Sequence, residues 1–148
     1  MKNKKNNKGF SLVELIVVVA IMAVLVAVLA PTLLRYVEKT RVQKDASAVS
    51  EVVQAVKIAL ADEDINKATS SGDKVVIVDS EDATELSTGN NTSLSTELGK
   101  TIGTVKFSSA NADDVTITIE MDEDGTPTLT VDTEATGAWG DAVKAVTP

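Results

Sequence analysis

The stretch that decides the fold is KGFSLVELIVVVAIMAVLVAVLAP, residues 8–31. After Glu14 it is an unbroken apolar run to Ala30, which Pro31 closes. A helix from Phe10 to Ala30 would be about 31 Å long, which matches the roughly 30 Å hydrocarbon core of a bilayer. In lipid only a helix satisfies every backbone group of a single segment. We therefore predict a membrane-spanning helix here.

Glu14 is the one ionisable side chain in the apolar stretch that follows Phe10. A carboxylate costs about 2.5 to 3.5 kcal/mol at the centre of a bilayer and less near its edge. No Lys, Arg or His lies between Ser11 and Leu34, so the segment itself supplies no cation. A cut after Gly9 would supply one, because it creates an α-amine on Phe10. We interpret Glu14 as a functional residue, and snorkelling to the interface is the alternative.

A basic leader precedes this segment and contains Lys2, Lys4, Lys5 and Lys8. Positively charged flanks stay on the cytoplasmic side of a membrane, so we predict that the N-terminus stays inside. A membrane-embedded peptidase can then remove residues 1–9 while the helix remains inserted.

The eight residues from Lys8 to Leu15, KGFSLVEL, resemble the prepilin cleavage and methylation motif of type IV pilins. The resemblance implies that prepilin peptidase cleaves between Gly9 and Phe10 and N-methylates Phe10, which keeps the charge of the amine. It also implies that Glu14 pairs with the N-terminal amine of a neighbouring subunit. Pro31 lies where the family has a helix-bending proline. The resemblance covers the first third of the chain.

The composition disfavours an enzyme. The 148 residues leave room for one small soluble domain after the membrane segment. The chain has no Cys and no His, which excludes a disulfide framework and removes the commonest zinc ligands and the usual acid–base catalyst. We therefore expect no catalytic residue and no cofactor. Many Gram-negative pilins are closed by a C-terminal disulfide, so the lack of Cys favours a Gram-positive source.

The charge balance is acidic. The formal net charge is -8, and removing the four leader lysines from the 14 basic residues leaves 10 against 22 acidic ones, or -12. Binding to nucleic acid requires clustered Lys and Arg to neutralise phosphates. We therefore expect no direct nucleic-acid binding by the mature chain.

Beyond Pro31 the helical pattern resumes, and we predict that it runs to about Leu60. Its apolar residues recur at alternating steps of four and three: Val42, Ala46, Val49, Val53, Val56 and Leu60. The opposite face is too charged for lipid, so this stripe must cover a sheet. Pro31 removes one backbone hydrogen bond and should bend the helix rather than break it. The prediction is an α+β, pilin-like fold with the long N-terminal helix packed on a small antiparallel β-sheet.

The same pattern divides the chain into three parts. We predict a leader peptide over 1–9 and a long helix over 10–61, of which 10–34 form the transmembrane segment and filament core. A soluble globular head with the antiparallel sheet then occupies 62–148.

Within the head, alternation and β-branched residues predict strands over 74–79, 104–108, 115–121 and 128–132. The last three are joined by short loops, which predicts an antiparallel meander. Residues 80–103 are predicted to be an irregular connection with one or two helical turns. The acidic residues 62–64 oppose the dipole of a helix C-terminus, so they open a new turn or short helix. Trp139 is predicted to anchor the C-terminal segment by packing.

Two polar motifs have an ordinary structural interpretation beside a functional one. Asp122, Glu123, Asp124 and Gly125 are typical of a hairpin turn, and Asp122 and Asp124 are a weak calcium candidate. No other metal site is expected. Asn90 and Asn91 both satisfy the N-glycosylation pattern, and we interpret them as polar loop.

These features predict a structural protein, the major pilin of a type IV pilus. It would polymerise through its N-terminal helix into an extracellular filament for adhesion, twitching motility or surface interaction. Gly9 and Phe10 would serve processing, and Phe10, Glu14 and Pro31 assembly. The expected partners are further copies of the chain in a helical homopolymer, prepilin peptidase, and the pilus assembly machinery with minor pilins. The cytoplasmic membrane would hold the single-pass precursor before export.

Two alternatives stay open. A pseudopilin of a type II secretion or competence (DNA-uptake) apparatus shares the N-terminal motif. A secreted or membrane-anchored binding domain belongs to a different class: the secreted form would have its signal peptide cut after Ala30, and the anchored form would keep its N-terminus uncut. Pro31 directly after that cut and Glu14 within the apolar run both disfavour it.

Overall fold

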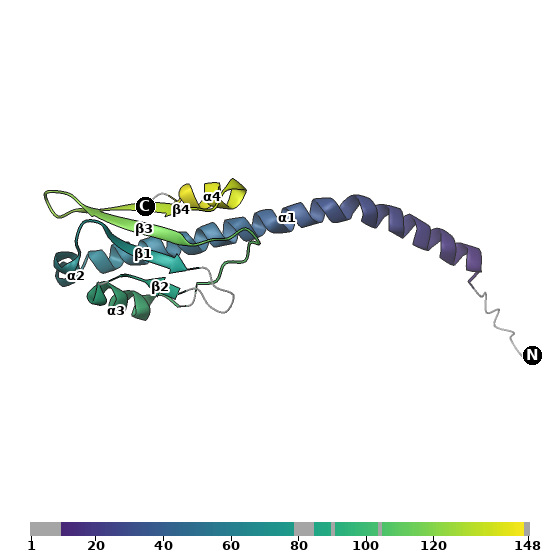
Figure 1. The fold of residues 1–148 in the computed structure, drawn as a ribbon. Helices are drawn as coiled ribbons and strands as arrows, with labels where there is room; N and C mark the ends of the chain where they lie inside the picture. Colours follow the sequence, from purple (N-terminus) through teal and green to yellow (C-terminus); the bar gives the residue numbers. More distant parts are fainter. Residues whose placement is uncertain (1–9, 79–84, 90, 104, 147–148) are drawn as a thin grey trace, which may run out of the picture. The chain divides into compact units, whose positions relative to one another are not determined.

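The computed structural model describes residues 10–78, 85–89, 91–103 and 105–146. The chain divides into two compact units, one up to Val37 and one from Glu38 onward. The first helix, α1 (Leu12–Leu60), contributes to both units (Figure 1). The second half of this helix therefore belongs to the compact head.

The first unit is the apolar half of α1. The 49-residue helix continues through Pro31 and ends at Leu60, as predicted. It is long and apolar enough to cross a membrane. The side chains from Phe10 to Leu34 are exposed around the whole helix, so this half lacks the one-sided pattern of a soluble core helix. A bend at Pro31 stays a prediction.

The second unit contains a four-stranded antiparallel sheet in the order β2-β1-β3-β4. The strands are β1 (Asp73–Val78), β2 (Glu85–Ser87), β3 (Val115–Met121) and β4 (Pro127–Thr133). Ile117 in β3 lies opposite Val75 on one side and Val131 on the other. This alternation places the apolar side chains on one face.

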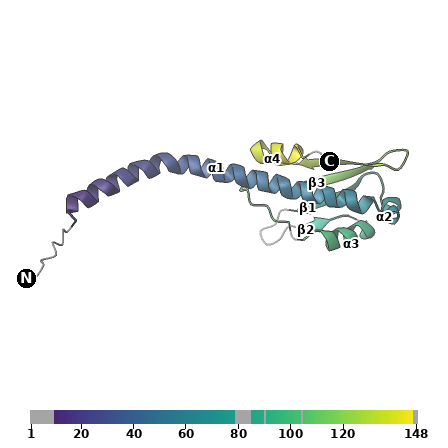
Figure 2. The ribbon, with the colours of Figure 1, turned by 180° about the vertical axis from the view of Figure 1, so that it is seen from behind.

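The helix covers that face, and Figures 1 and 2 show α1 running along the sheet within this unit. Its buried residues from Val42 to Leu60 join the strand side chains in one hydrophobic core. The predicted α+β fold, with the long helix on a small antiparallel sheet, is confirmed.

The predicted strand over 104–108 is wrong for the residues described there. Val105 makes a single bridge, and residues 106–108 form no strand. At the end of this segment the N–H groups of Ser108 and Ser109 donate to the Asp45 side chain rather than to a neighbouring strand. On the side of β3 away from β4, the pairing strand is β1 and not residues 104–108. The sheet is therefore not the expected meander of the last three predicted strands.

The connection over 80–103 contains more structure than predicted. It includes β2 and the ten-residue helix α3 (Thr92–Thr101), whose Leu94 and Leu98 are buried. The short helix after α1 was predicted, and it is α2 (Glu63–Ala68). The Asp62 carboxylate caps it by accepting from the N–H groups of Asp64 and Ile65.

The C-terminal segment forms helix α4 (Gly137–Lys144), which the sequence did not predict. Trp139 on this helix is 1% exposed and packs edge-on against Phe107 at 5.3 Å between ring centroids. Its predicted role as a packing anchor is confirmed. A Cβ at Gly140 would lie 2.2 Å from the Ala135 carbonyl oxygen, so only glycine fits there.

Asp45 holds these parts together. Its side chain is fully buried on the core face of α1. Oδ1 accepts from the Ser108 N–H at 2.8 Å, and Oδ2 accepts from the Ser109 N–H at 2.9 Å and from Trp139 Nε1–H at 3.0 Å. One side chain therefore joins α1 to the loop before β3 and to α4.

We predict that Asp45→Ala lowers the free energy of unfolding of the head by about 3–5 kcal/mol, because it leaves three N–H groups unpaired in the core. Trp139 is the single tryptophan, so its fluorescence during urea unfolding of the full chain in detergent reports on this region. The exposed acid Glu51 on the same helix supplies the control, since Glu51→Ala should change stability by no more than about 0.5 kcal/mol. An Asp45→Ala midpoint equal to that of the unaltered chain would contradict the prediction.

Candidate processing and assembly site

Two of the predicted processing and assembly residues, Phe10 and Glu14, lie at the start of α1. Phe10 is 89% exposed and precedes the first helical residue, Leu12, by two positions. Gly9 lies outside the described residues. The α-nitrogen of Phe10 is therefore presented at the end of an exposed apolar helix.

Glu14 is engaged with the start of its own helix. The backbone N–H of Ser11 donates to Glu14 Oε2 at 2.9 Å, and the N–H of Leu15 donates to the Ser11 carbonyl at 3.3 Å. Ser followed three residues later by Glu is a capping box, in which the carboxylate satisfies a backbone donor that the helix leaves unpaired. Negative charge is also stabilised at this end by the helix dipole. This bond keeps the Glu14 carboxylate beside the residue that follows Phe10.

Pro31 is not brought together with these two residues. It lies inside α1, 17 positions after Glu14, which corresponds to about 25 Å along a helix. Its role in assembly stays a prediction.

The helix surface between Glu14 and Leu34 is apolar. The large side chains from Leu15 to Leu34 are all apolar and between 45% and 70% exposed. Exposed apolar surface of this extent marks a membrane or protein contact. The arrangement binds apolar neighbours and offers a single carboxylate at one end.

The calcium candidate is used by a hairpin turn. Asp122 Oδ1 accepts from the N–H of Asp124 at 3.0 Å and of Thr126 at 2.7 Å, and Gly125 has a φ of +78°. Among the described residues, no group of three or more acidic side chains is placed to hold a metal ion. The structure thus gives Asp122 a role in the turn between β3 and β4.

Asn91, one of the two glycosylation candidates, is a buried structural residue. Its Oδ1 accepts from the Leu94 N–H at 3.0 Å, and its Nδ2 donates to Thr69 Oγ1 at 3.0 Å and Asp73 Oδ2 at 3.1 Å. It caps α3 and ties this helix to the end of α2 and the start of β1. Asn90 lies outside the described residues.

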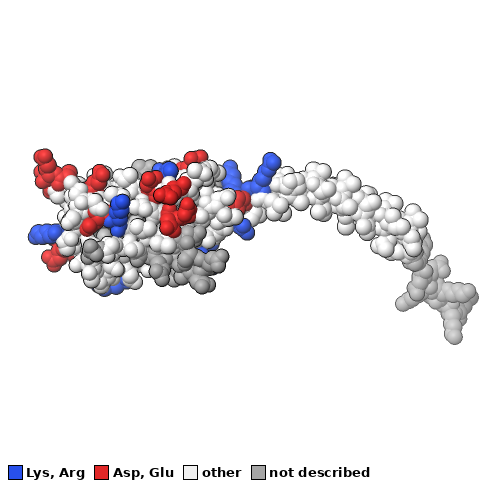
Figure 3. Space-filling view, in the orientation of Figure 1, with Lys and Arg blue, Asp and Glu red and all other residues white. Residues whose placement is uncertain are grey.

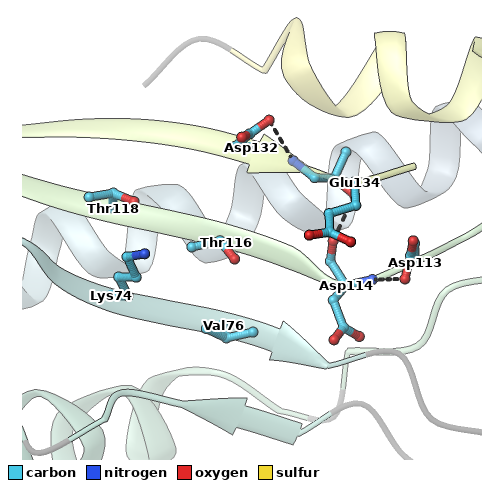
Figure 4. Close-up of a pocket in the computed structure, with 9 residues that line it drawn as sticks. Lys74, Val76, Asp113, Asp114, Thr116, Thr118, Asp132 and Glu134 are labelled. Atoms are coloured by element: carbon cyan, nitrogen blue, oxygen red, sulfur yellow. Dashed lines mark hydrogen bonds between the residues drawn. The ribbon is translucent and has the colours of Figure 1, made fainter. Parts of the chain in front are cut away.

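A hollow of about 400 Å³ lies on the outer face of the sheet (Figure 4). Its walls carry Asp113, Asp114, Asp132 and Glu134, with Lys74 and threonine hydroxyls beside them. Lys144 Nζ lies 3.6 Å from Asp132 Oδ1, and Thr133 Oγ1 donates to the Asp114 carbonyl. The chain has neither His nor Cys to serve here as base or nucleophile. The hollow is a polar, mostly acidic surface.

Comparison with known proteins identifies the first part of the chain. Residues 4–30 match the family described as the prokaryotic N-terminal methylation motif, which is typical of type IV pilins and pseudopilins. No curated protein and no solved structure matches the chain. The first part of the chain thus has a class III signal peptide of the kind found in type IV pilins and pseudopilins, and the fold that follows it is pilin-like. The motif implies processing by prepilin peptidase and pilus-like assembly.

We predict that calcium leaves the melting temperature of the full chain unchanged, because the Asp122 carboxylate already accepts two backbone N–H groups. Asp122→Ala should destabilise the turn by about 1 kcal/mol whether or not calcium is present. Thermal unfolding with calcium and with a chelator measures both effects. A calcium-dependent rise in melting temperature that Asp124→Ala abolishes would restore the metal site.

Proposed function

We propose that the mature chain is the major subunit of a type IV pilus. The observation that carries this proposal is the combination of the methylation motif with an apolar helix that has no partner in the monomer and a compact head at its other end. A filament whose core is made of such helices buries that apolar surface and displays the heads. No step requires chemistry on a substrate.

Processing would take place in the cytoplasmic membrane. Prepilin peptidase would cut between Gly9 and Phe10. The basic leader, which ends with Lys8 and Gly9, would stay on the cytoplasmic side. Methylation of the Phe10 amine keeps its positive charge. The mature subunit therefore starts with one cation, four residues before its one intramembrane acid, Glu14.

Assembly would pair those two charges between copies. Glu14 Oε2 accepts from Ser11 in the monomer, and the carboxylate has further lone pairs for the amine of a neighbouring Phe10. A charge buried without a partner costs several kcal/mol, so a mispaired subunit is rejected from the apolar core. Because lipid is already apolar, tight packing and this pair must favour the filament over the membrane.

The head would form the outer surface. Its charged side chains are mostly acidic on the face in Figure 3, which keeps the filament soluble and disfavours binding to nucleic acid. Adhesion, twitching motility or other surface interaction would use this surface. The assembly machinery and minor pilins complete the set of partners.

Electron microscopy of a deletion strain separates this proposal from its nearest relative. Loss of long surface filaments supports a major pilin. Intact filaments together with a loss of secretion or DNA uptake would show a pseudopilin instead.

We predict that the mature protein begins with N-methylated Phe10. Mass spectrometry of the intact chain from cells with prepilin peptidase measures this. A start at Pro31 would show an ordinary secretory signal peptide, and a retained Met1 would show an uncut membrane anchor. Either result would contradict the proposal.

A second prediction separates processing from assembly. Gly9→Val should block cleavage, because the peptidase needs a small residue before the cut. Glu14→Ala should still be cleaved but should form few filaments, since the amine loses its partner. Glu120→Ala, which removes an exposed acid from the head, is the control and should assemble normally. Abundant filaments from Glu14→Ala would remove the proposed pairing.

A further inference from the structure

Basic side chains lie together at the beginning of the head, in a chain whose charges are otherwise mostly acidic. Lys39, Arg41 and Lys44 fall within the first seven residues of the head unit, and all three are exposed. Figure 3 shows Lys and Arg side chains gathered at this end of the head. Together with Lys106 they form what we call the basic patch.

The buried Asp45 contact brings Lys106 to the same place. Lys106 lies two residues before Ser108, whose N–H donates to Asp45 Oδ1 at 2.8 Å. The Ser108 hydroxyl also accepts from Lys44 Nζ at 3.1 Å. The Lys106 side chain is exposed, while Phe107 beside it is buried. The loop before β3 therefore adds a fourth cation beside α1.

The acids nearest to the patch on α1 are already engaged. Glu38 accepts from the Ser109 hydroxyl and lies 3.7 Å from the Arg41 guanidinium. Asp45 is fully buried and accepts three N–H groups. Lys39 forms no ion pair within the part of the chain that the structure describes. The patch therefore keeps most of its positive charge for an outside partner.

Two further acids follow in the same loop. Asp113 and Asp114 line the hollow on the outer face of the sheet (Figure 4). The helix α1, which contains most of the patch, packs on the opposite face of the sheet. These two acids therefore do not neutralise the patch.

The apolar stretch of α1 ends immediately before the patch. Residues 15–34 contain no ionisable side chain, and as a helix they span about 30 Å, the thickness of a hydrocarbon core. A bilayer that covers this stretch has one edge next to Leu34. Lys39 follows Leu34 by five residues, at most about 8 Å of helix, and the headgroup layer is roughly 5–8 Å thick. The chain itself thus limits how far Lys39 can lie from the headgroups.

The patch lies on the side of the membrane where basic residues do not help insertion. Lys and Arg favour the cytoplasmic side, which the leader occupies under the proposed function, whereas the head is exported. The basic residues next to the exported end of the span therefore need another use. Clustered Lys and Arg bind surfaces of phosphate groups, and the nearest such surface is the membrane itself.

We propose that the basic patch binds the anionic phospholipid headgroups of the membrane that holds the precursor. The inference rests on the membrane-held stage of the proposed function, and it gives the head a partner before assembly. Each cation near an anionic membrane strengthens binding by about fivefold, and the attraction falls off over a Debye length of about 8 Å. The patch holds the start of the head at the headgroups until the subunit enters a filament.

Quenching of a fluorescent label by lipid tests the contact in the full chain. Gln43 is exposed between Arg41 and Lys44, and the chain has no cysteine, so Gln43→Cys accepts a single label. The labelled chain is reconstituted in phosphatidylcholine vesicles with or without phosphatidylglycerol, each with a trace of lipid that carries a nitroxide on its headgroup. We expect phosphatidylglycerol to raise the quenching about twofold or more, and high salt to remove the rise.

Two triple variants separate the patch from the net charge of the head. Replacing three lysines of the patch by Gln should abolish the rise, whereas removing the same charge from exposed lysines elsewhere on the head should keep it. Trp139 fluorescence in urea checks that both variants stay folded. If loss of the Lys44 bond lowers the unfolding midpoint, the pair Lys39→Gln and Lys106→Gln replaces the patch variant and should at least halve the rise. The patch variant is Lys39→Gln, Lys44→Gln and Lys106→Gln, and the control is Lys57→Gln, Lys67→Gln and Lys100→Gln.

The outcomes separate the inference from the proposed function. No rise with phosphatidylglycerol, or an equal loss in both triple variants, would overturn the lipid contact and leave pilin function intact. A rise that appears only at high protein-to-lipid ratio would assign the patch to the acidic head of a second copy and would also overturn it. A failure of the unaltered chain to form filaments in cells would instead remove the proposed function, while the quenching result would stand.

Discussion

The structure depends on a difference in apolar exposure between the two halves of α1. From Leu15 to Leu34, α1 exposes apolar side chains on every side, and from Val42 to Leu60 it buries one stripe under a sheet. The first half is stable in lipid or among other apolar helices, and the second half needs its own head. Because one continuous helix contains both, the surroundings of the apolar half can change while the head stays folded.

The head is closed by a buried polar contact rather than by apolar packing alone. Asp45 lies among valines on the core face of α1 and accepts three N–H groups from distant parts of the chain. The carboxylate fixes where the loop before β3 and helix α4 must lie, since apolar packing alone is less directional. Asn91 has a similar role at the other end of the sheet, where it joins α2, β1 and α3.

Local patterns predicted the elements whose cause is local. The apolar run and the 3.6-residue period located α1 to its last residue, and alternation located β3 and β4. The failures have long-range causes. The segment 104–108 has strand composition, but the N–H of its last residue, Ser108, bonds to Asp45, which lies 63 residues earlier in the chain. The glycines of α4 disfavour a helix, and only the approach of Ala135 explains Gly140.

The candidate functional residues also separate into those with a local sequence signal and those set by long-range contacts. The motif around Phe10 and Glu14 is contiguous, so the sequence alone located it. The buried state of Asn91 depends on Thr69 and Asp73, which lie far along the chain, so no sequence pattern marked it. Burial of this kind is determined only when the head folds.

The capping bond at the start of α1 bears on the proposed cut between Gly9 and Phe10. Its donor, Ser11, and its acceptor, Glu14, both lie on the helix side of that peptide bond. Removal of the leader would therefore leave this first turn closed, and the helix would not have to refold. Maturation would then change only the charge at the start of a preformed helix, because a neutral peptide nitrogen would become a cation.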